Sequence, residues 1–205
     1  APVEKLQGDA RSAYQKARND GVEILEGSSL SDADLQARID SAAVVVDAML
    51  GTGVAGAPRE PFASIIRQLN QSGKPVLAVD LPSGLNATTG AAEGDVVHAD
   101  VTVTFIGAKT GLFTGAGAGV CGQVMFEALG AMHAGQQSGE MPLAELYPWA
   151  RCKAWLPERP ANAHKGLFGH VLVVAGDHGF GGAGIMAAEA ASRAGAGLVS
   201  LATRP

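Results

Sequence analysis

A repeated alternation of short apolar runs with helical segments limits the fold of this chain more than any other feature. The expected strands are 42–50 (AAVVVDAML), 74–80 (KPVLAVD), 99–108 (ADVTVTFIGA) and 122–130 (GQVMFEALG), with a shorter one at 21–25 (GVEIL). The expected helices are 8–20, 31–42 and 61–73, and none is expected between the last three strands. Alternation of this kind is typical of a parallel sheet wrapped by helices. The sequence therefore predicts a Rossmann-like α/β layer over residues 1–130.

Local signals mark the ends of two helices. Ser31 and Asp34 have the spacing of a capping box, so a helix should begin after Ser31. In the next helix the apolar residues recur at positions i, i+3, i+4 and i+7, and Gly73 is expected to close it.

Beyond residue 130 the character of the chain changes. Residues 131–162 contain scattered prolines, glycines and polar residues without a sustained period, which indicates a linker. Residues 163–205 read as strand, glycine loop, small-residue helix and strand. A single β-α-β unit cannot cover both faces of its sheet. We therefore expect the start of a second domain, with strands Val171–Ala175 and Leu198–Ala202 partly uncovered.

Composition excludes several classes of function. The chain has 205 residues, of which 47% are hydrophobic and 17% charged, and a net charge of −5. No apolar run approaches the roughly 20 residues that span a bilayer, and the first twenty residues are polar, so a cytoplasmic protein is expected. No basic stripe favours nucleic acid, and Cys121 and Cys152 lack the spacing of a metal or redox pair. A small-molecule ligand fits best.

A G-x-G-x-x-G pattern at Gly51, Gly53 and Gly56 follows the strand at 42–50. In the dinucleotide fingerprint the third glycine lies inside a helix that begins on the turn. Here Pro58 and Pro61 follow too soon for such a helix, because proline is tolerated only in a first helical turn. We expect an extended loop, with the helix starting near Pro61, rather than the phosphate turn of an NAD enzyme.

Carboxylates end two of the expected strands. Asp47 and Asp80 could each cap the amides of their own turn, or line a ligand site at the carboxyl edge of the sheet. Ser83 is either a turn hydroxyl or, with Asp47, a hard oxygen ligand for a cation. Lys109, after another strand, is either a solvated surface lysine or a substrate contact.

These residues carry a resemblance to a known family. VDAMLGTGVAGAPREPF, LAVDLPSGLNATTG and ADVTVTFIGAKTGLFTGAG together resemble the YjeF N-terminal domain, an NAD(P)HX epimerase. HKGLFGHVLVVAGDHGFGGAGIMAAEAASRAGAGLV resembles the opening of the NAD(P)HX dehydratase domain, which has a ribokinase-like fold. Their order in one chain resembles that of the bifunctional NAD(P)H-hydrate repair enzymes.

The resemblance implies roles for individual residues. It implies acid/base catalysis by Asp80, with Lys109 as a second catalytic candidate, and a potassium ion on Asp47 and Ser83. It implies R- and S-NADHX or NADPHX as substrate, ADP or ATP for the dehydratase half with magnesium as an option, and allows a homo-oligomer. The implied substrate contacts are Gly51, Thr52, Gly53, Val54, Ala55, Gly56, Ala57, Asp80 and Ala183.

The chain also departs from the family pattern. The family's Asn-Gly-Gly-Asp-Gly loop, the nucleotide-binding glycines of the dehydratase and its catalytic aspartate are absent. We therefore expect an interior fragment without full activity of its own. Two other interpretations stay open: a noncatalytic binding module with the same N-terminal fold, and a ribokinase-like small-molecule kinase for the C-terminal part. The presence of Asp47, Asp80 and Ser83 together favours the enzyme.

Overall fold

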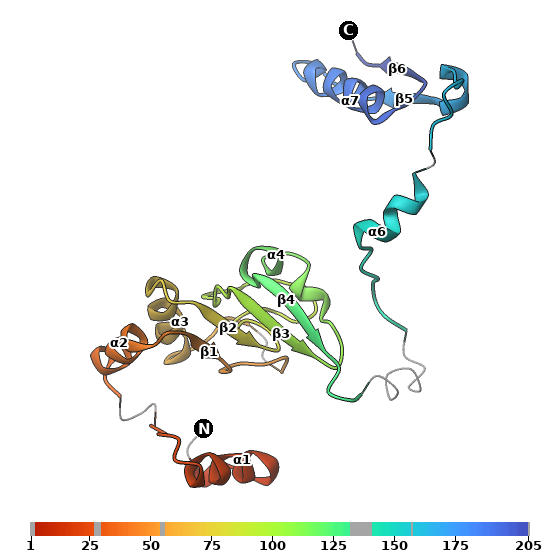
Figure 1. Ribbon diagram of the computed structural model, residues 1–205. Helices are drawn as coiled ribbons and strands as arrows, with labels where there is room; N and C mark the ends of the chain where they lie inside the picture. The colour runs from red at the N-terminus through yellow and green to blue at the C-terminus, as the bar shows by residue number, and fades with distance from the viewer. Residues whose placement is uncertain (1–2, 27–29, 54–55, 132–140, 157, 205) are drawn as a thin grey trace. The chain divides into compact units, whose positions relative to one another are not determined.

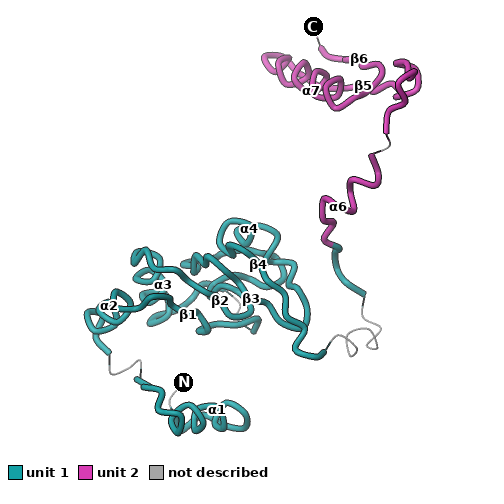
Figure 2. Tube along the Cα trace, viewed as in Figure 1, with its two compact units in different colours: residues 1–145 teal, residues 146–205 magenta. Residues whose placement is uncertain are grey.

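The chain folds into two compact units, residues 1–145 and 146–205, shown in Figure 2. The computed structural model describes residues 3–26, 30–53, 56–131, 141–156 and 158–204. The stretch expected to be a linker, 131–162, contains the division between the units. It also contains two short helices that its irregular sequence does not reveal, α6 (Trp149–Cys152) and η4 (Lys153–Trp155).

The first unit is built on a four-stranded sheet (Figure 1). Its strands are β1 (Val45–Asp47), β2 (Val76–Val79), β3 (Val101–Phe105) and β4 (Gln123–Glu127), in that spatial order. Every neighbouring pair is parallel. The α/β fold with a parallel sheet is therefore confirmed, and its four strands lie within the four longer runs expected to form strands.

Four helices precede β2 in the described part of this unit: η1 (Val3–Lys5), α1 (Gly8–Asn19), α2 (Asp32–Ser41) and α3 (Phe62–Gln71). Local signals mark the start of α2 and the end of α3. The capping box before α2 is confirmed, because the Asp34 N–H donates to Ser31 Oγ at 3.1 Å and the Ser31 N–H donates to the Asp34 carboxylate at 3.3 Å. Gly73 follows α3 with a φ of +66°, a conformation that glycine adopts without strain.

One face of the sheet carries the core. Ile66 and Leu69 of α3 pack with Val76 and Ala78 of β2. A second cluster lies beside it, formed by residues after β2 and before β4: Leu81, Leu85, Leu112, Val120 and Cys121. The opposite face carries the side chains of Val46 and Met125, which are 55% and 51% exposed. The core therefore packs against one face of the sheet. It includes residues of the segments that follow β2 and β3.

Two expectations about this unit are wrong. Residues 21–25 do not form a strand: Val22 and Ile24 are exposed, and no described strand pairs with them, so the segment lacks the hydrogen bonds that define one. Short helices also lie between β3 and β4, namely η3 (Thr110–Leu112) and α4 (Gly117–Val120). They are too short and too rich in glycine to produce a helical period in the sequence.

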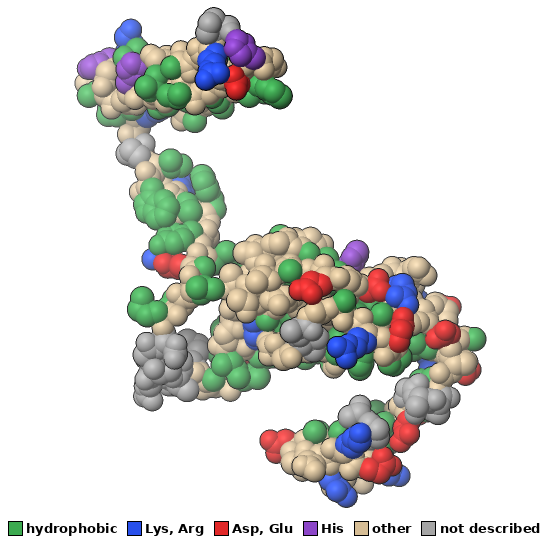
Figure 3. Space-filling view, turned by 180° about the vertical axis from the view of Figure 1, so that it is seen from behind, with side chains coloured by type: hydrophobic (Ala, Val, Ile, Leu, Met, Phe, Trp, Pro, Cys, Tyr) green, Lys and Arg blue, Asp and Glu red, His purple; other side chains and the backbone are tan. Residues whose placement is uncertain are grey.

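The second unit contains one β-α-β element. It consists of η5 (Lys165–Phe168), β5 (His170–Val174), α7 (Gly181–Ala194) and β6 (Leu198–Ala202), and the two strands are parallel. As expected, its apolar side chains are largely uncovered: Leu172 is 63% exposed and Val174 77%. Figure 3 shows hydrophobic side chains on the surface of this unit.

No helix among the described residues is both long enough and apolar enough to cross a membrane.

Candidate functional site

The candidate site lies at the carboxyl edge of the four-stranded sheet. Parallel strands end at the same edge, and ligands of open α/β sheets bind there. Asp47 is the last residue of β1, and Asp80 directly follows β2. Both carboxylates therefore leave the sheet at this edge, as the sequence predicts, together with the loop that follows Phe105 of β3.

Asp47 binds the loop after the neighbouring strand. Its Oδ1 accepts hydrogen bonds from Ser83 Oγ at 2.7 Å and from the Met49 N–H at 3.2 Å, and its Oδ2 accepts one from the Ser83 N–H at 2.8 Å. Ser83 Oγ in turn accepts from the Leu50 N–H at 2.9 Å. Asp47 is thus a cap of its own turn and also a link between two loops, which agrees with the capping interpretation, while its role in a ligand site stays a prediction.

The charge of Asp47 is not balanced by any cationic side chain in the described ranges. The residue is only 1% exposed, and all three of its donors are neutral. Buried carboxylates are normally paired with a cation or bind a metal. The described residues contain no group of three or more His, Cys, Asp or Glu side chains that could hold a metal. One carboxylate with hydroxyl and carbonyl oxygens nearby suits a hard cation rather than a transition metal.

Asp80 forms an ion pair with Lys109. The Lys109 ammonium donates to Asp80 Oδ1, to Thr104 Oγ1 at 3.2 Å and to the Phe105 carbonyl at 2.9 Å. The side chain of Lys109 is only 19% exposed and that of Asp80 26%. Lys109 is therefore not a solvated surface lysine; it is half-buried against the carboxylate at the sheet edge.

The environment of Asp80 keeps it ionised. Burial by itself would raise the pKa of this carboxyl, but the hydrogen bond from Lys109, the Phe105 N–H and the charge of Lys109 outweigh it, so the pKa lies below its usual 3.8. Every described donor acts on Oδ1. Within the described part of the chain, Oδ2 accepts no hydrogen bond and is available to a ligand.

Asp80 also has an unusual backbone, with φ at +72°. Positive φ is rare outside glycine, although Asp and Asn tolerate it better than other residues. Such strained positions cluster at functional sites. The turn directs Asp80 across β3, toward Phe105 and Lys109, rather than along its own loop.

Thr104 belongs to this site, and the sequence analysis missed it. It is fully buried, it donates to Asp80 Oδ1 at 3.3 Å, and it accepts from Lys109. A signal was available: Thr102 and Thr104 alternate with apolar residues along β3, so two hydroxyls face the same side of a buried strand.

The described parts of the glycine loop, residues 51–53 and 56–61, contain no helix, as expected, and α3 begins only after Pro61. Of the predicted contacts, Gly51, Thr52, Gly53, Gly56 and Ala57 are exposed. Val54 and Ala55 lie outside the described residues.

Ala183 belongs to the second unit. It is an exposed residue of α7, near the N-terminus of that helix.

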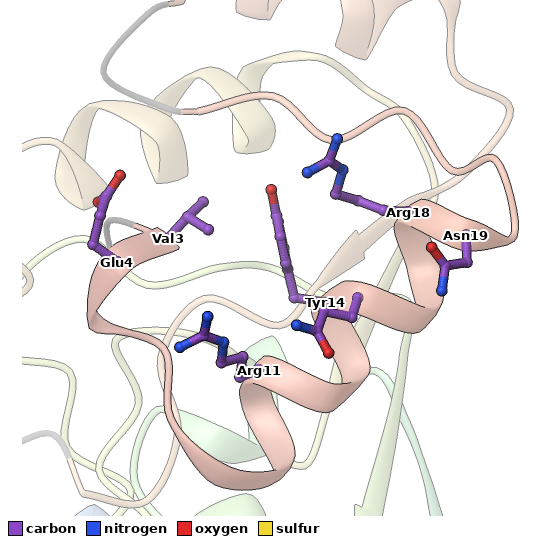
Figure 4. Close-up of a pocket in the computed structure, with 7 residues that line it drawn as sticks. Val3, Glu4, Arg11, Tyr14, Arg18 and Asn19 are labelled. Atoms are coloured by element: carbon purple, nitrogen blue, oxygen red, sulfur yellow. The ribbon is translucent and has the colours of Figure 1, made fainter.

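A recess of about 670 Å³ lies elsewhere in the first unit, between η1 and α1. Figure 4 shows side chains from both elements, among them Glu4, Arg11 and Tyr14, pointing into the same open space. None of the predicted site residues lines it. The candidate site lies at the sheet edge rather than in this recess. The sheet edge contains the strained backbone of Asp80, its ion pair with Lys109 and the buried carboxylate of Asp47.

Comparison with known proteins finds one matching family model and several similar curated proteins. The model of a family described as YjeF-related protein N-terminus matches residues 1–111. The bifunctional NAD(P)H-hydrate repair enzyme Nnr of Coxiella burnetii is 46% identical over 79% of this chain, and that of Escherichia coli 44% over 80%. The bifunctional NAD(P)H-hydrate repair enzyme of Leishmania braziliensis is 40% identical over all of it. The chain covers 33%, 32% and 36% of these relatives, about a third of their length.

Proposed function

Because the chain belongs to the family of YjeF-related protein N-termini, we propose that its first unit epimerises the R and S forms of NAD(P)HX, the hydrated nicotinamide nucleotides. The observation that carries the proposal is the Asp80–Lys109 pair, half-buried at the sheet edge. The names of the relatives describe NAD(P)H-hydrate repair, which is consistent with this substrate.

In this pair Lys109 can donate a proton and Asp80 can accept one. Epimerisation at the hydroxyl-bearing carbon of NAD(P)HX requires that the hydroxyl leaves and returns on the other face of the ring. In our proposal the Lys109 ammonium protonates the hydroxyl, which leaves as water while the ring nitrogen stabilises the cation. Water then adds to the opposite face, and its proton returns to the pair through Asp80 Oδ2. A positioned acid and base of this kind contribute about 10²- to 10⁴-fold to a rate.

The glycine loop would hold the rest of the substrate. Glycines let a ligand approach the backbone N–H groups closely, and backbone N–H groups bind phosphate oxygens. Gly51, Thr52, Gly53, Gly56 and Ala57 follow β1 at the same edge as Asp80, so the pyrophosphate would lie along this loop.

A monovalent cation, potassium in the family pattern, fits at Asp47. The buried carboxylate lacks a cationic partner among the described residues, and Ser83 Oγ lies 3.4 Å from the Leu50 carbonyl, so hard oxygens surround the position. Asp47 and Ser83 would hold the ion. It would neutralise the carboxylate and fix the two loops that flank the substrate.

Potassium should therefore stabilise the protein. At equal ionic strength, we expect the thermal midpoint to be about 2–5 °C higher in potassium chloride than in tetramethylammonium chloride, because only potassium fits among these oxygens. Asp47→Asn, which removes the charge at nearly constant shape, should abolish the difference. Equal midpoints for the unaltered protein in both salts would count against the cation.

The proposed activity has a direct test. The purified full protein is mixed with the R form of NADHX, and conversion to the S form is followed by chromatography. We expect the mixture to reach the same R to S ratio from either pure form within minutes, far faster than without protein. A rate equal to that of the protein-free control would refute the proposal.

For the second unit we propose the opening part of an NAD(P)HX dehydratase domain with a ribokinase-like fold. Its parallel β5-α7-β6 element supports this, and so does a relative named bifunctional that matches the whole chain. Ala183 would contact the substrate, and ADP or ATP, with magnesium as an option, would drive dehydration. A noncatalytic binding module would not need the Asp80–Lys109 pair, and a ribokinase-like kinase would not account for the first unit.

A further inference from the structure

A narrow recess lies between the glycine loop and the segment that follows β2. It is lined by Gly51 and Gly56 from the glycine loop and by Gly84, Asn86 and Glu93 from the segment between β2 and β3, with Leu85 and Ala91 completing its wall. Its interior has room for a group about the size of one water molecule. Three of the lining residues are glycines, so the polar side chains that face a ligand here are those of Asn86 and Glu93.

Glu93 lies beside the glycine loop. Its Oε2 lies 3.7 Å from the position that a Cβ on Gly56 would occupy. The next residue, Gly94, packs so closely that a Cβ there would lie 2.9 Å from Ala57 Cβ. Asp95 is held by Arg67 of α3 at 2.6 Å. The carboxylate of Glu93 has no hydrogen-bond or ion-pair partner in the described part of the chain, so it is free to accept one from a ligand.

Asn86 supplies the complementary donor. Its Oδ1 accepts hydrogen bonds from the N–H groups of Thr88 and Thr89, both at 3.0 Å. These two bonds fix the orientation of the amide and leave Nδ2 as the group without a partner among the described residues. A hydroxyl group both donates and accepts, so it matches this pair. A phosphate dianion only accepts, is larger than the recess, and would meet the negative charge of Glu93.

From these contacts we infer that the recess binds the 2′-hydroxyl of the adenosine ribose, and that Glu93 thereby makes the first unit prefer NADHX over NADPHX. The inference rests on the proposed function, since it specifies the substrate of that site. An acidic residue on the ribose hydroxyl is a general means of rejecting a 2′-phosphate in dinucleotide sites. Here the acid is not Asp80, which is paired with Lys109, but Glu93, a residue of the segment between β2 and β3 that lies beside the glycine loop.

Binding of two probes tests this without requiring turnover. ADP-ribose and its 2′-phosphate are titrated into the full protein by calorimetry. We expect ADP-ribose to bind at least about tenfold more tightly than its 2′-phosphate. Glu93→Gln should narrow the ratio of the two dissociation constants to about threefold or less, because it removes the charge while the side chain keeps its size. Asn86→Asp keeps the oxygen that caps Thr88 and Thr89 and adds a negative charge, so it should widen the ratio.

Asp20→Asn is the matched control. It removes one exposed carboxylate in α1's C-terminal turn, away from the recess, and should leave the ratio unchanged. Equal binding of the two probes, no binding of either, or a ratio that Glu93→Gln does not alter would overturn the inference. If the ratio responds as expected but NADHX is not epimerised, the proposed function fails while the recess assignment stands. If NADHX is epimerised and the ratio does not respond, the assignment fails alone.

Discussion

Replacing Asp80 with asparagine is expected to lower the rate of NADHX epimerisation by about 10²- to 10⁴-fold, because the amide cannot take the proton that the returning water releases. The fold should survive. Asparagine tolerates a φ of +72° almost as well as aspartate does, whereas alanine would add backbone strain. The Thr104 hydroxyl and the Phe105 N–H can still donate to the remaining side-chain oxygen.

The measurement is the initial rate of R to S conversion, with circular dichroism to verify the fold. Glu23→Gln serves as the control, since Glu23 is also an ion-paired carboxylate, bound to Arg38, but lies on the surface away from the site. It should retain the full rate. A rate for Asp80→Asn within a factor of about two of that of Glu23→Gln would remove Asp80 from the mechanism.

The lowered pKa of Asp80 also predicts how the epimerisation rate depends on pH. Since the carboxylate stays ionised down to pH values below 3.8, its protonation cannot reduce the wild-type rate near neutral pH. We therefore expect no loss of activity attributable to Asp80 between about pH 5 and 7. Asp80→Asn should be slow throughout this range, with no recovery at either end.

The largest expected loss of stability follows from Asp47→Ala. The substitution leaves the Ser83 N–H, the Ser83 hydroxyl and the Met49 N–H without their acceptor in a buried position. Each buried donor left unpaired costs about 1–3 kcal/mol, so we expect the free energy of unfolding to fall by about 3 kcal/mol or more. Urea denaturation in potassium-free buffer, followed by circular dichroism, measures it.

Two further variants show whether the hydrogen bonds are the cause. Asp47→Asn keeps one acceptor oxygen and should lose less than half as much stability. Asp34→Ala removes a carboxylate that accepts an N–H at the exposed start of α2, and should lower the free energy of unfolding much less than Asp47→Ala does. If Asp47→Ala is no more destabilising than Asp34→Ala, the Asp47–Ser83 link does not hold the two loops together.

The sequence by itself determined the secondary structure that positions the site. Strand and helix periods, the capping box at Ser31 and the prolines after the glycine loop are local properties, and they correctly placed the parallel sheet, α2 and the start of α3. Since all strands of a parallel sheet end at one edge, the positions of Asp47 and Asp80 after apolar runs also predicted that their carboxylates share that edge. The strand expected at 21–25 was wrong because an apolar run becomes a strand only when another strand pairs with it.

Only the tertiary structure decided which side chains meet. Lys109 and Asp80 are 29 positions apart in the sequence, and Ser83 and Asp47 are 36 apart. These contacts depend on the register of neighbouring strands and on the path of each loop, such as the positive φ that turns Asp80 across β3. No periodicity encodes such a path, because it results from packing between segments that are distant in the chain. The approach of Glu93 to Gly56 was hidden for the same reason.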